Sequence, residues 1–163
     1  MSTPRSVTIR YPVVVLSVVP PDQASIFESA EGRVVVWFPA PGMAAARLTG
    51  YATGELARKA YEVTDAQPTV PYEGFLDLYE TTGFDWEARG RSLKWNIVHL
   101  SPRMMLHMLV QTPPLVMATQ IFRHALRNHV EIHTDKATFA SAYHLAVKRR
   151  TRAAATSRPP PGP

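Results

Sequence analysis

Three histidines and two arginines stand close together in residues 112–136, TPPLVMATQIFRHALRNHVEIHTDK. If the segment is one helix, His129 and His133 lie four residues apart on the same face, a spacing that can hold a metal ion. Zinc needs at least a third protein ligand, and His124 lies about 140° around the helix from His129. We therefore predict no metal site and no catalytic residue here. The segment is interpreted as a core helix with a basic outer face.

A second interpretation comes from a resemblance. Residues 101–124, SPRMMLHMLVQTPPLVMATQIFRH, resemble a segment of the flavin-dependent thymidylate synthases. In that family a His-x-[Ser/Thr]-Pro stretch precedes an apolar run, a proline and a helix ending in Gln-x-x-Arg-His-Arg. The residues at similar spacing are His99, Ser101, Pro102, Pro114, Ala118, Gln120, Phe122, Arg123, His124 and Glu131. The resemblance implies a small enzyme or a nucleotide- or flavin-binding domain that uses Arg123, His124 and Glu131.

The chain departs from that family beyond the Arg-His pair. The family continues with Arg-x-x-Ser-x-Asn-Glu-x-Ser-x-Arg-Tyr, and those side chains are expected to bind nucleotide and flavin. The residues found in their place are Ala125, Asn128, Val130, His133, Asp135 and Lys136. The resemblance covers about 35 of the 163 residues. We therefore keep it as the alternative interpretation and expect no cofactor.

Basic residues gather toward the C-terminus. Residues 1–98 carry nine basic and eleven acidic residues (−2), whereas residues 99–163 carry nine basic and two acidic residues (+7). Such a field favours a polyanionic or acidic partner. The alternative is solvation, or neutralisation by the acidic part of a neighbouring copy. The predicted polyanion-binding residues are Arg123, Arg127, Lys148, Arg149, Arg150, Arg152 and Arg158.

Several classes of function are made improbable by what the sequence lacks. There is no cysteine, which excludes disulfides, thiolate catalysis and cysteine zinc sites. There is no phosphate-binding loop, GxGxxG or GxSxG motif. No signal peptide is apparent, and no apolar run approaches the roughly 18 residues of a membrane span. Enzymatic activity stays open, with a non-enzymatic role favoured. We expect a soluble protein, cytoplasmic or within a virion or another large assembly.

The first hundred residues alternate between strand and helix signals. Strands are predicted where β-branched residues cluster or alternate, and helix where alanine and leucine dominate. Gly50 and Gly54 interrupt the expected helix, and Thr53 can cap its second part. Residues 20–32 are expected to form a turn with one helical turn, and residues 72–83 are ambiguous. The predicted elements are strands at 7–21, 33–38 and 91–100 and a helix at 43–62.

The remaining chain predicts helices. Ser101-Pro102 and Thr112-Pro113 are each typical of a helix start. The third helix, 136–150, follows Thr134 or Asp135 as its cap. The residues expected on the inner faces of the second and third helices are Leu115, Ala118, Phe122, Ala125, Leu126, His129, Phe139, Ala142, Tyr143 and Ala146.

These elements predict an α+β fold in a single domain, residues 1–150. Its strand-rich part, 1–100, forms a small N-terminal sheet with short helices, and 101–150 form a helical unit. Residues 151–163 form a disordered, basic, proline-rich tail, and deletion after Val147 is expected to leave the fold intact. The predicted function is a non-enzymatic structural or assembly component, such as a viral or phage structural protein, a matrix-like protein or an accessory subunit. Its basic end would contact nucleic acid or an acidic protein surface, and its partners would be proteins or copies of itself.

Overall fold

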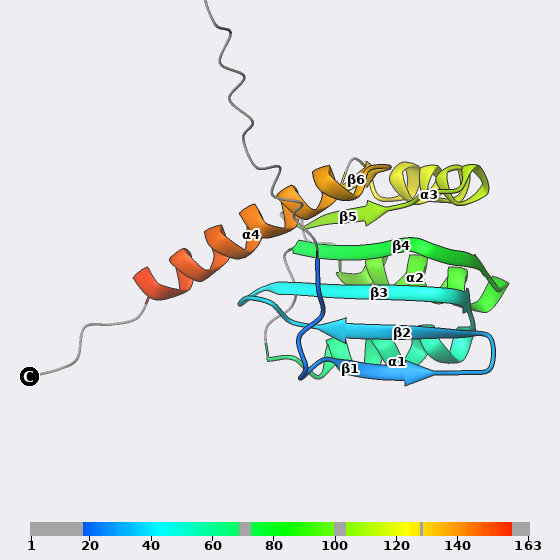
Figure 1. Ribbon diagram of the computed structural model, residues 1–163, viewed down its shortest axis with the longest axis horizontal. Coiled ribbons are helices and arrows are strands. Elements are labelled where there is room, and N and C mark those ends of the chain that lie inside the picture. Colours follow the sequence, from blue (N-terminus) through cyan, green and yellow to red (C-terminus); the bar gives the residue numbers. More distant parts are fainter. Residues whose placement is uncertain (1–17, 69–72, 100–103, 128, 158–163) are drawn as a thin grey trace, which may run out of the picture.

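The computed structural model describes residues 18–68, 73–99, 104–127 and 129–157. Within these ranges six strands form one sheet in the order in which they occur in the chain (Figure 1). The first three strands pair antiparallel, and from the third strand onward the pairing is parallel. The strands are β1 (Ser25–Glu28), β2 (Gly32–Trp37), β3 (Met43–Ala52), β4 (Glu73–Phe84), β5 (Met105–Leu109) and β6 (Val130–His133).

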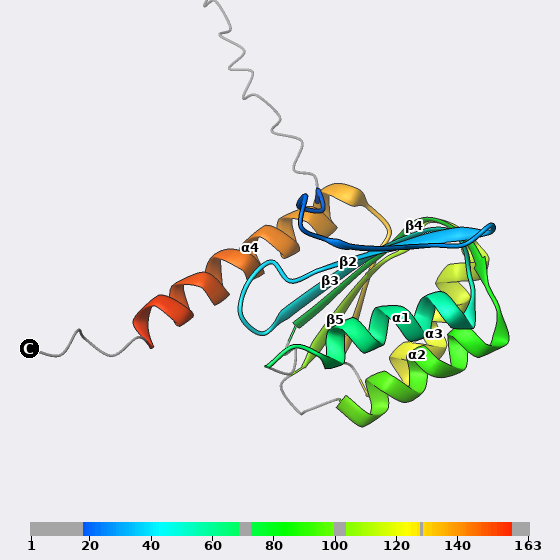
Figure 2. The ribbon, with the colours of Figure 1, turned by 90° about the horizontal axis from the view of Figure 1, so that it is seen from below.

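Helices cover both faces of this sheet. Three of them connect consecutive parallel strands: α1 (Gly54–Asp65), α2 (Trp86–His99) and α3 (Pro113–Ala125). Parallel crossovers are almost always right-handed, so strands added in one direction place their helices on one face. Figure 2 shows α1, α2 and α3 together on that face, with α4 (Lys136–Thr156) on the opposite side. Of the helices in the described ranges, none has both the length and the apolar run that crossing a bilayer requires.

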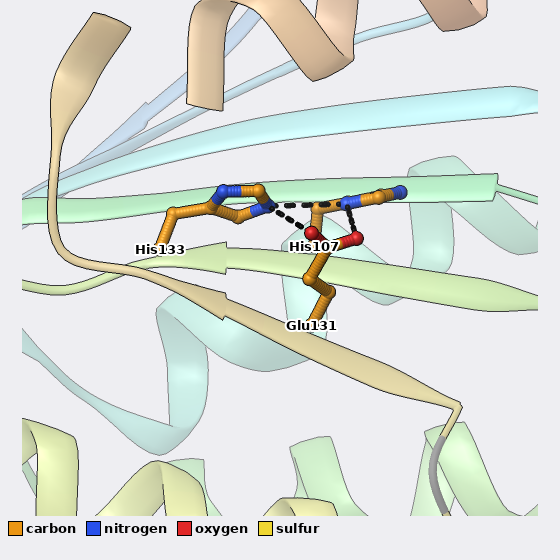
Figure 3. A group of neighbouring side chains, drawn as sticks. All are labelled: His107, Glu131 and His133. Carbon is orange, nitrogen blue, oxygen red and sulfur yellow. Dashed lines mark hydrogen bonds and ion pairs between the residues drawn. The ribbon is translucent and has the colours of Figure 1, made fainter. Parts of the chain in front are cut away.

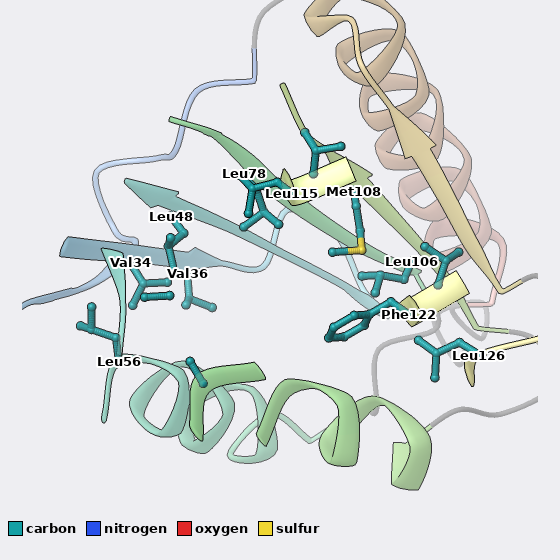
Figure 4. Packing of buried hydrophobic residues seen from close by; sticks show 14 residues of the cluster. Val34, Val36, Leu48, Leu56, Leu78, Leu106, Met108, Leu115, Phe122 and Leu126 are labelled. Atoms are coloured by element: carbon teal, nitrogen blue, oxygen red, sulfur yellow. The ribbon is translucent and has the colours of Figure 1, made fainter. Parts of the chain in front are cut away.

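The face under α1, α2 and α3 carries the larger apolar core (Figure 4). Alternate strand residues point into it, because successive side chains of a strand lie on opposite faces. A cavity of about 150 Å³ remains between the sheet and these helices, lined mainly by apolar side chains. The labelled core residues are Val34, Val36, Leu48, Leu56, Leu78, Leu106, Met108, Leu115, Phe122 and Leu126.

The opposite face packs against α4. Phe75 of β4 meets Phe139 and Tyr143 of α4 edge to face. The Trp37 indole N–H donates a 2.9 Å hydrogen bond to the Tyr143 hydroxyl within this buried layer. Both faces of β2 are therefore covered, which explains the continuous apolar run VVVW at its end. As expected, Phe139, Tyr143 and Ala146 face inward from α4.

Polar caps fix where the helices begin. Thr53 and Asp135 cap α1 and α4, as the sequence predicted, by accepting from the N–H groups of Leu56 and Thr138. Asp85 has a double role, since its carboxylate accepts from Gly54 N at 3.0 Å and Ala88 N at 2.6 Å. One side chain thus joins the starts of α1 and α2.

The predicted mixture of strands and helices is confirmed, but its division into an N-terminal sheet and a C-terminal helical unit is wrong. Residues 43–52 form β3 and not a helix, because backbone pairing with both β2 and β4 outweighs the helix propensity of their alanine and leucine residues. Gly50 also has a φ of +74°, which interrupts any helix. Conversely, residues 91–99 belong to α2, where Trp95 stacks on Tyr61 and on His99.

The C-terminal half contains two further strands that the sequence interpretation assigned to helices. β5 (MLHML) and β6 (VEIH) are only five and four residues long, and over so short a stretch periodicity alone does not separate a strand from a buried helix segment. The strand at 33–38 is confirmed as β2, whereas 20–32 contains β1 in place of a helical turn. Most of the strand at 7–21, Ser101-Pro102 and Arg158 lie outside the described residues. Helix α4 continues to Thr156, so residues 151–156 of the expected tail are helical.

Candidate functional site

A cluster of titratable side chains lies on the α4 face of the parallel part of the sheet. In the register of these strands, His107 of β5 lies beside Phe75 of β4 on one side and Glu131 of β6 on the other. Glu73 and His133 lie two residues along their own strands and therefore on the same face as Phe75 and Glu131. The cluster thus draws one group each from β4 and β5 and two groups from β6.

Glu73 is the buried anion of this cluster, with a side chain that is 7% exposed. Nη2 of Arg149 donates to both of its carboxylate oxygens, at 2.6 and 2.8 Å, and Nε of Arg150 approaches at 3.3 Å. Burial alone would raise the pKa of Glu73, but its interactions with His107, Arg149 and Arg150 outweigh burial and lower the pKa to about 2. The carboxylate is therefore charged at any physiological pH.

His107 is held in a fixed orientation between Glu73 and Phe75. Its ring stacks on the Phe75 ring, with centroids 4.3 Å apart and planes 8° apart. Its Nε2 lies 3.7 Å from Oε1 of Glu73. A facing carboxylate favours the tautomer that carries its proton on Nε2, which leaves Nδ1 with a free lone pair.

Three ligand-type atoms converge on the other side of the His107 ring (Figure 3). Nδ1 of His107 lies 3.2 Å from Nε2 of His133 and 3.2 Å from Oε2 of Glu131. Nε2 of His133 lies 3.8 Å from Oε1 of Glu131. Both imidazoles are buried, whereas the Glu131 side chain is 56% exposed and opens the cluster to solvent.

The His133 imidazole is biased toward its neutral form. Burial lowers its pKa, the Glu131 carboxylate opposes that shift, and His107 adds to it. A neutral imidazole can bind a metal or accept a proton. The cluster can therefore hold a metal ion or a shared proton, with the Glu73 carboxylate facing Nε2 of His107 from behind.

The predicted polyanion-binding residues do not form one group. Arg149 and Arg150 bind Glu73, so deletion after Val147 removes both partners of a buried carboxylate, and we now expect it to destabilise the fold. Lys148 and Arg152 are exposed on α4. Arg123 lies at the end of α3 and Arg127 just beyond it, on the side of the sheet opposite to α4.

Helix α3 presents a mixed apolar and basic surface. Met117 and Ile121, four residues apart, are 72% and 45% exposed. Within the described part of the chain, neither Arg123 nor Arg127 forms an ion pair. Together with the exposed Gln120 and His124, these residues define the α3 surface: Met117, Gln120, Ile121, Arg123, His124 and Arg127.

The structure separates the residues that the resemblance and the histidine spacing had grouped. Arg123 and His124 are exposed on α3, whereas Glu131 lies on the α4 face of the sheet. His129 is not on a helix with His133, and its Nδ1 lies 2.8 Å from the Met104 carbonyl oxygen. The sequence interpretation missed Glu73 and His107. Alternation in the strands Met105–Leu109 and Val130–His133 is the signal that would have placed His107, Glu131 and His133 on one face.

Solved structures with a similar fold exist. An uncharacterized protein of the DUF3478 family with a SpoIIAA-like fold, from Shewanella loihica PV-4, is 15% identical, with a TM-score of 0.50 over 73% of this chain and 90% of that chain. A sulfate transporter family protein from Wolinella succinogenes is 17% identical, with a TM-score of 0.51 over 66% of this chain and 88% of that chain. No protein-family model matches the chain, and no curated protein matches its sequence.

These likenesses establish a SpoIIAA-like fold and correct the predicted function. A viral or phage structural component whose basic end contacts nucleic acid is contradicted, because the structural neighbours are a SpoIIAA-like protein and a sulfate transporter family protein. The flavin- or nucleotide-binding alternative loses its proposed site, because Arg123 and His124 lie on α3 and Glu131 lies on β6, on the other face of the sheet.

Proposed function

We propose that this chain is a regulatory domain of the SpoIIAA-like (STAS) type that acts by binding a protein partner on the α3 surface. The fold supports the class of function, since both structural neighbours share the sheet with its covering helices. The observation that carries the proposal is the exposure of Met117 and Ile121 beside Arg123 and Arg127.

Methionine and isoleucine are expected to be buried, so an exposed pair on one stripe favours an interface. Their positions follow from the helix period: Leu115, Thr119 and Phe122 point into the core, which places Met117 and Ile121 on the outer side. Methionine suits such a surface because its flexible side chain adapts to a partner.

The positive charges of the α3 surface indicate that its protein partner carries acidic side chains. Arg123 in the last turn of α3 and Arg127 just beyond its end are both exposed and positively charged, which favours an anionic partner. A partner that places apolar side chains on Met117 and Ile121 and carboxylates beside Arg123 and Arg127 satisfies both features. Carboxylates at the rim act mainly on the rate and specificity of association, so binding should weaken as salt rises.

Site-specific photo-crosslinking in the native host tests this proposal. A photo-reactive residue replaces Ile121, and the matched control replaces Leu145, which is exposed on α4. We expect one discrete protein to crosslink from position 121, to be absent from position 145, and to be lost when Arg123→Glu is added. Crosslinking of the same protein from both positions, or persistence of the adduct with Arg123→Glu, would reject the α3 surface as the interface.

A further inference from the structure

We infer that His107, His133 and Glu131 form a binding site for a divalent transition-metal ion of the zinc type. The inference does not depend on partner binding at α3, because the site lies on the opposite face of the sheet. It rests on the positions of the ligand atoms, the orientation of His107 and the access provided by Glu131.

The ligand atoms stand at the separations that a bound ion requires. Zinc with nitrogen and oxygen ligands has bonds of about 2.0–2.2 Å, and tetrahedral angles then place ligand atoms about 3.3–3.5 Å apart. Nδ1 of His107 and Nε2 of His133 lie 3.2 Å apart, and Glu131 presents Oε2 at 3.2 Å from the first and Oε1 at 3.8 Å from the second. A small rotation of the exposed Glu131 carboxylate would direct one of these oxygens to an ion held by both rings.

The surroundings of His107 are those of a metal ligand. Its Nδ1 faces the other two ligand atoms, while its Nε2 faces the buried Glu73 carboxylate. A carboxylate behind a histidine fixes the ring and raises its basicity as a ligand. Stacking on Phe75 removes the remaining rotational freedom. The ring is thus ordered before any ion arrives.

Charge and donor type select the ion. Two imidazoles favour zinc, copper, nickel or iron over magnesium and calcium, which prefer oxygen ligands. Glu131 adds one negative charge directly at the ion. Arg149 and Arg150 bind Glu73 on the far side of His107, where its carboxylate cancels one of their two positive charges.

The alternative is a hydrogen-bonded histidine pair, in which His133 Nε2–H donates to His107 Nδ1 across the same 3.2 Å. That arrangement uses one proton where the metal would sit. A hydrogen-bonded pair does not need Glu131, so Glu131→Gln would then leave the response of the protein to Zn²⁺ unchanged. The metal site and the hydrogen-bonded pair therefore differ in whether Zn²⁺ binds and raises the Tm, and in which substitutions weaken that binding.

Equilibrium dialysis and thermal unfolding of the full chain, stripped with a chelator, test the inference with Zn²⁺ as the probe. We expect one Zn²⁺ per chain and a higher Tm with Zn²⁺ but not with Mg²⁺. Glu131→Gln should weaken Zn²⁺ binding at least about tenfold, and His133→Gln or His107→Gln should abolish it. The controls are Glu80→Gln and His124→Gln, which alter exposed residues of β4 and α3 and should bind Zn²⁺ like the wild type.

Glu131→Gln decides the matter if the variants of the buried histidines fail to fold, because its side chain is 56% exposed. Zn²⁺ binding by the wild type that is no tighter than that by Glu131→Gln would overturn the metal site and favour the hydrogen-bonded pair. Equal loss of Zn²⁺ binding in the His124→Gln control would also overturn it, because the ion would then be bound elsewhere.

Discussion

The Arg149 guanidinium binds both carboxylate oxygens of Glu73, at 2.6 and 2.8 Å, across 76 positions of sequence. This contact joins the C-terminal half of α4 to the first residue of β4. The sequence predicted that Arg149 belongs to a polyanion-binding cluster, but in the structure it pairs with the buried Glu73 carboxylate. Loss of Arg149 would leave Glu73 with only Arg150 and His107.

Arg149→Met should accordingly lower the free energy of unfolding by about 1–3 kcal/mol, since a buried carboxylate loses its main partner. The effect stays below that of a fully buried pair because the Arg149 side chain is 58% exposed. Urea unfolding measures it. Arg152→Met, on the exposed side of the same helix, should change stability by less than about 0.5 kcal/mol. Equal effects of the two substitutions would show that the Glu73 contact contributes nothing.

Phe122 is the second test of the fold. It is buried on the inner side of α3 and lines the cavity between this helix and the sheet. Phe122→Ala should destabilise the protein by about 3–5 kcal/mol, because it removes apolar contacts and enlarges that cavity. Met117→Ala, on the outer side of the same helix, should cost less than about 0.5 kcal/mol in chemical denaturation. A small loss for Phe122→Ala would mean that α3 does not pack as described.

Asp85 joins two helix starts, so its removal should cost more than one ordinary cap. Asp85→Ala leaves the N–H groups of Gly54 and Ala88 without their acceptor. We expect a loss of about 1–3 kcal/mol in thermal or urea unfolding, against about 1 kcal/mol for a single cap. Asp22→Ala, which removes an exposed carboxylate, is the control. Identical stability of the two variants would contradict the double cap.

Arg127 has a φ of +46°, a left-handed conformation that glycine adopts without steric cost. Arg127→Gly should therefore raise the free energy of unfolding by about 0.5–1 kcal/mol. The contrasting variant is Arg123→Gly, within the last turn of α3, which should lower it by about 1 kcal/mol. If Arg127→Gly is instead the more damaging of the two, the side chain makes a stabilising contact that outweighs the backbone strain.

The sequence predicted local features better than their arrangement. Caps at Thr53 and Asp135, the inner face of α4 and part of that of α3 were found because they depend on neighbours within a few residues. Ala125 was expected on the inner face of α3 but is exposed, and His129 lies beyond the end of the helix. Residues 43–52 were misassigned because alanine and leucine favour helix in isolation. In the fold they form a strand between β2 and β4, and pairing outweighs propensity.

The candidate site could not be predicted from the sequence, because it too depends on pairing between strands that are distant in the chain. His107, Glu131 and His133 meet only because β5 and β6 are parallel neighbours, and both strands were interpreted as helix. On a helix, His129 and His133 share a face; on the strand, His133 instead points toward His107. The basic residues were recognised by type, but their division between Glu73, the exposed side of α4 and the α3 surface depends on the topology.

The most direct test of the central claim is the affinity of the partner identified by crosslinking for three forms of the full chain: wild type, Arg123→Glu and Arg152→Glu. Both substitutions reverse an exposed charge, one on the α3 surface and one on α4. If the partner binds the α3 surface, Arg123→Glu raises the Kd about tenfold or more with little change in Tm, whereas Arg152→Glu leaves the Kd within about twofold of the wild-type value. A larger loss with Arg152→Glu, or no loss with either, would contradict binding at the α3 surface.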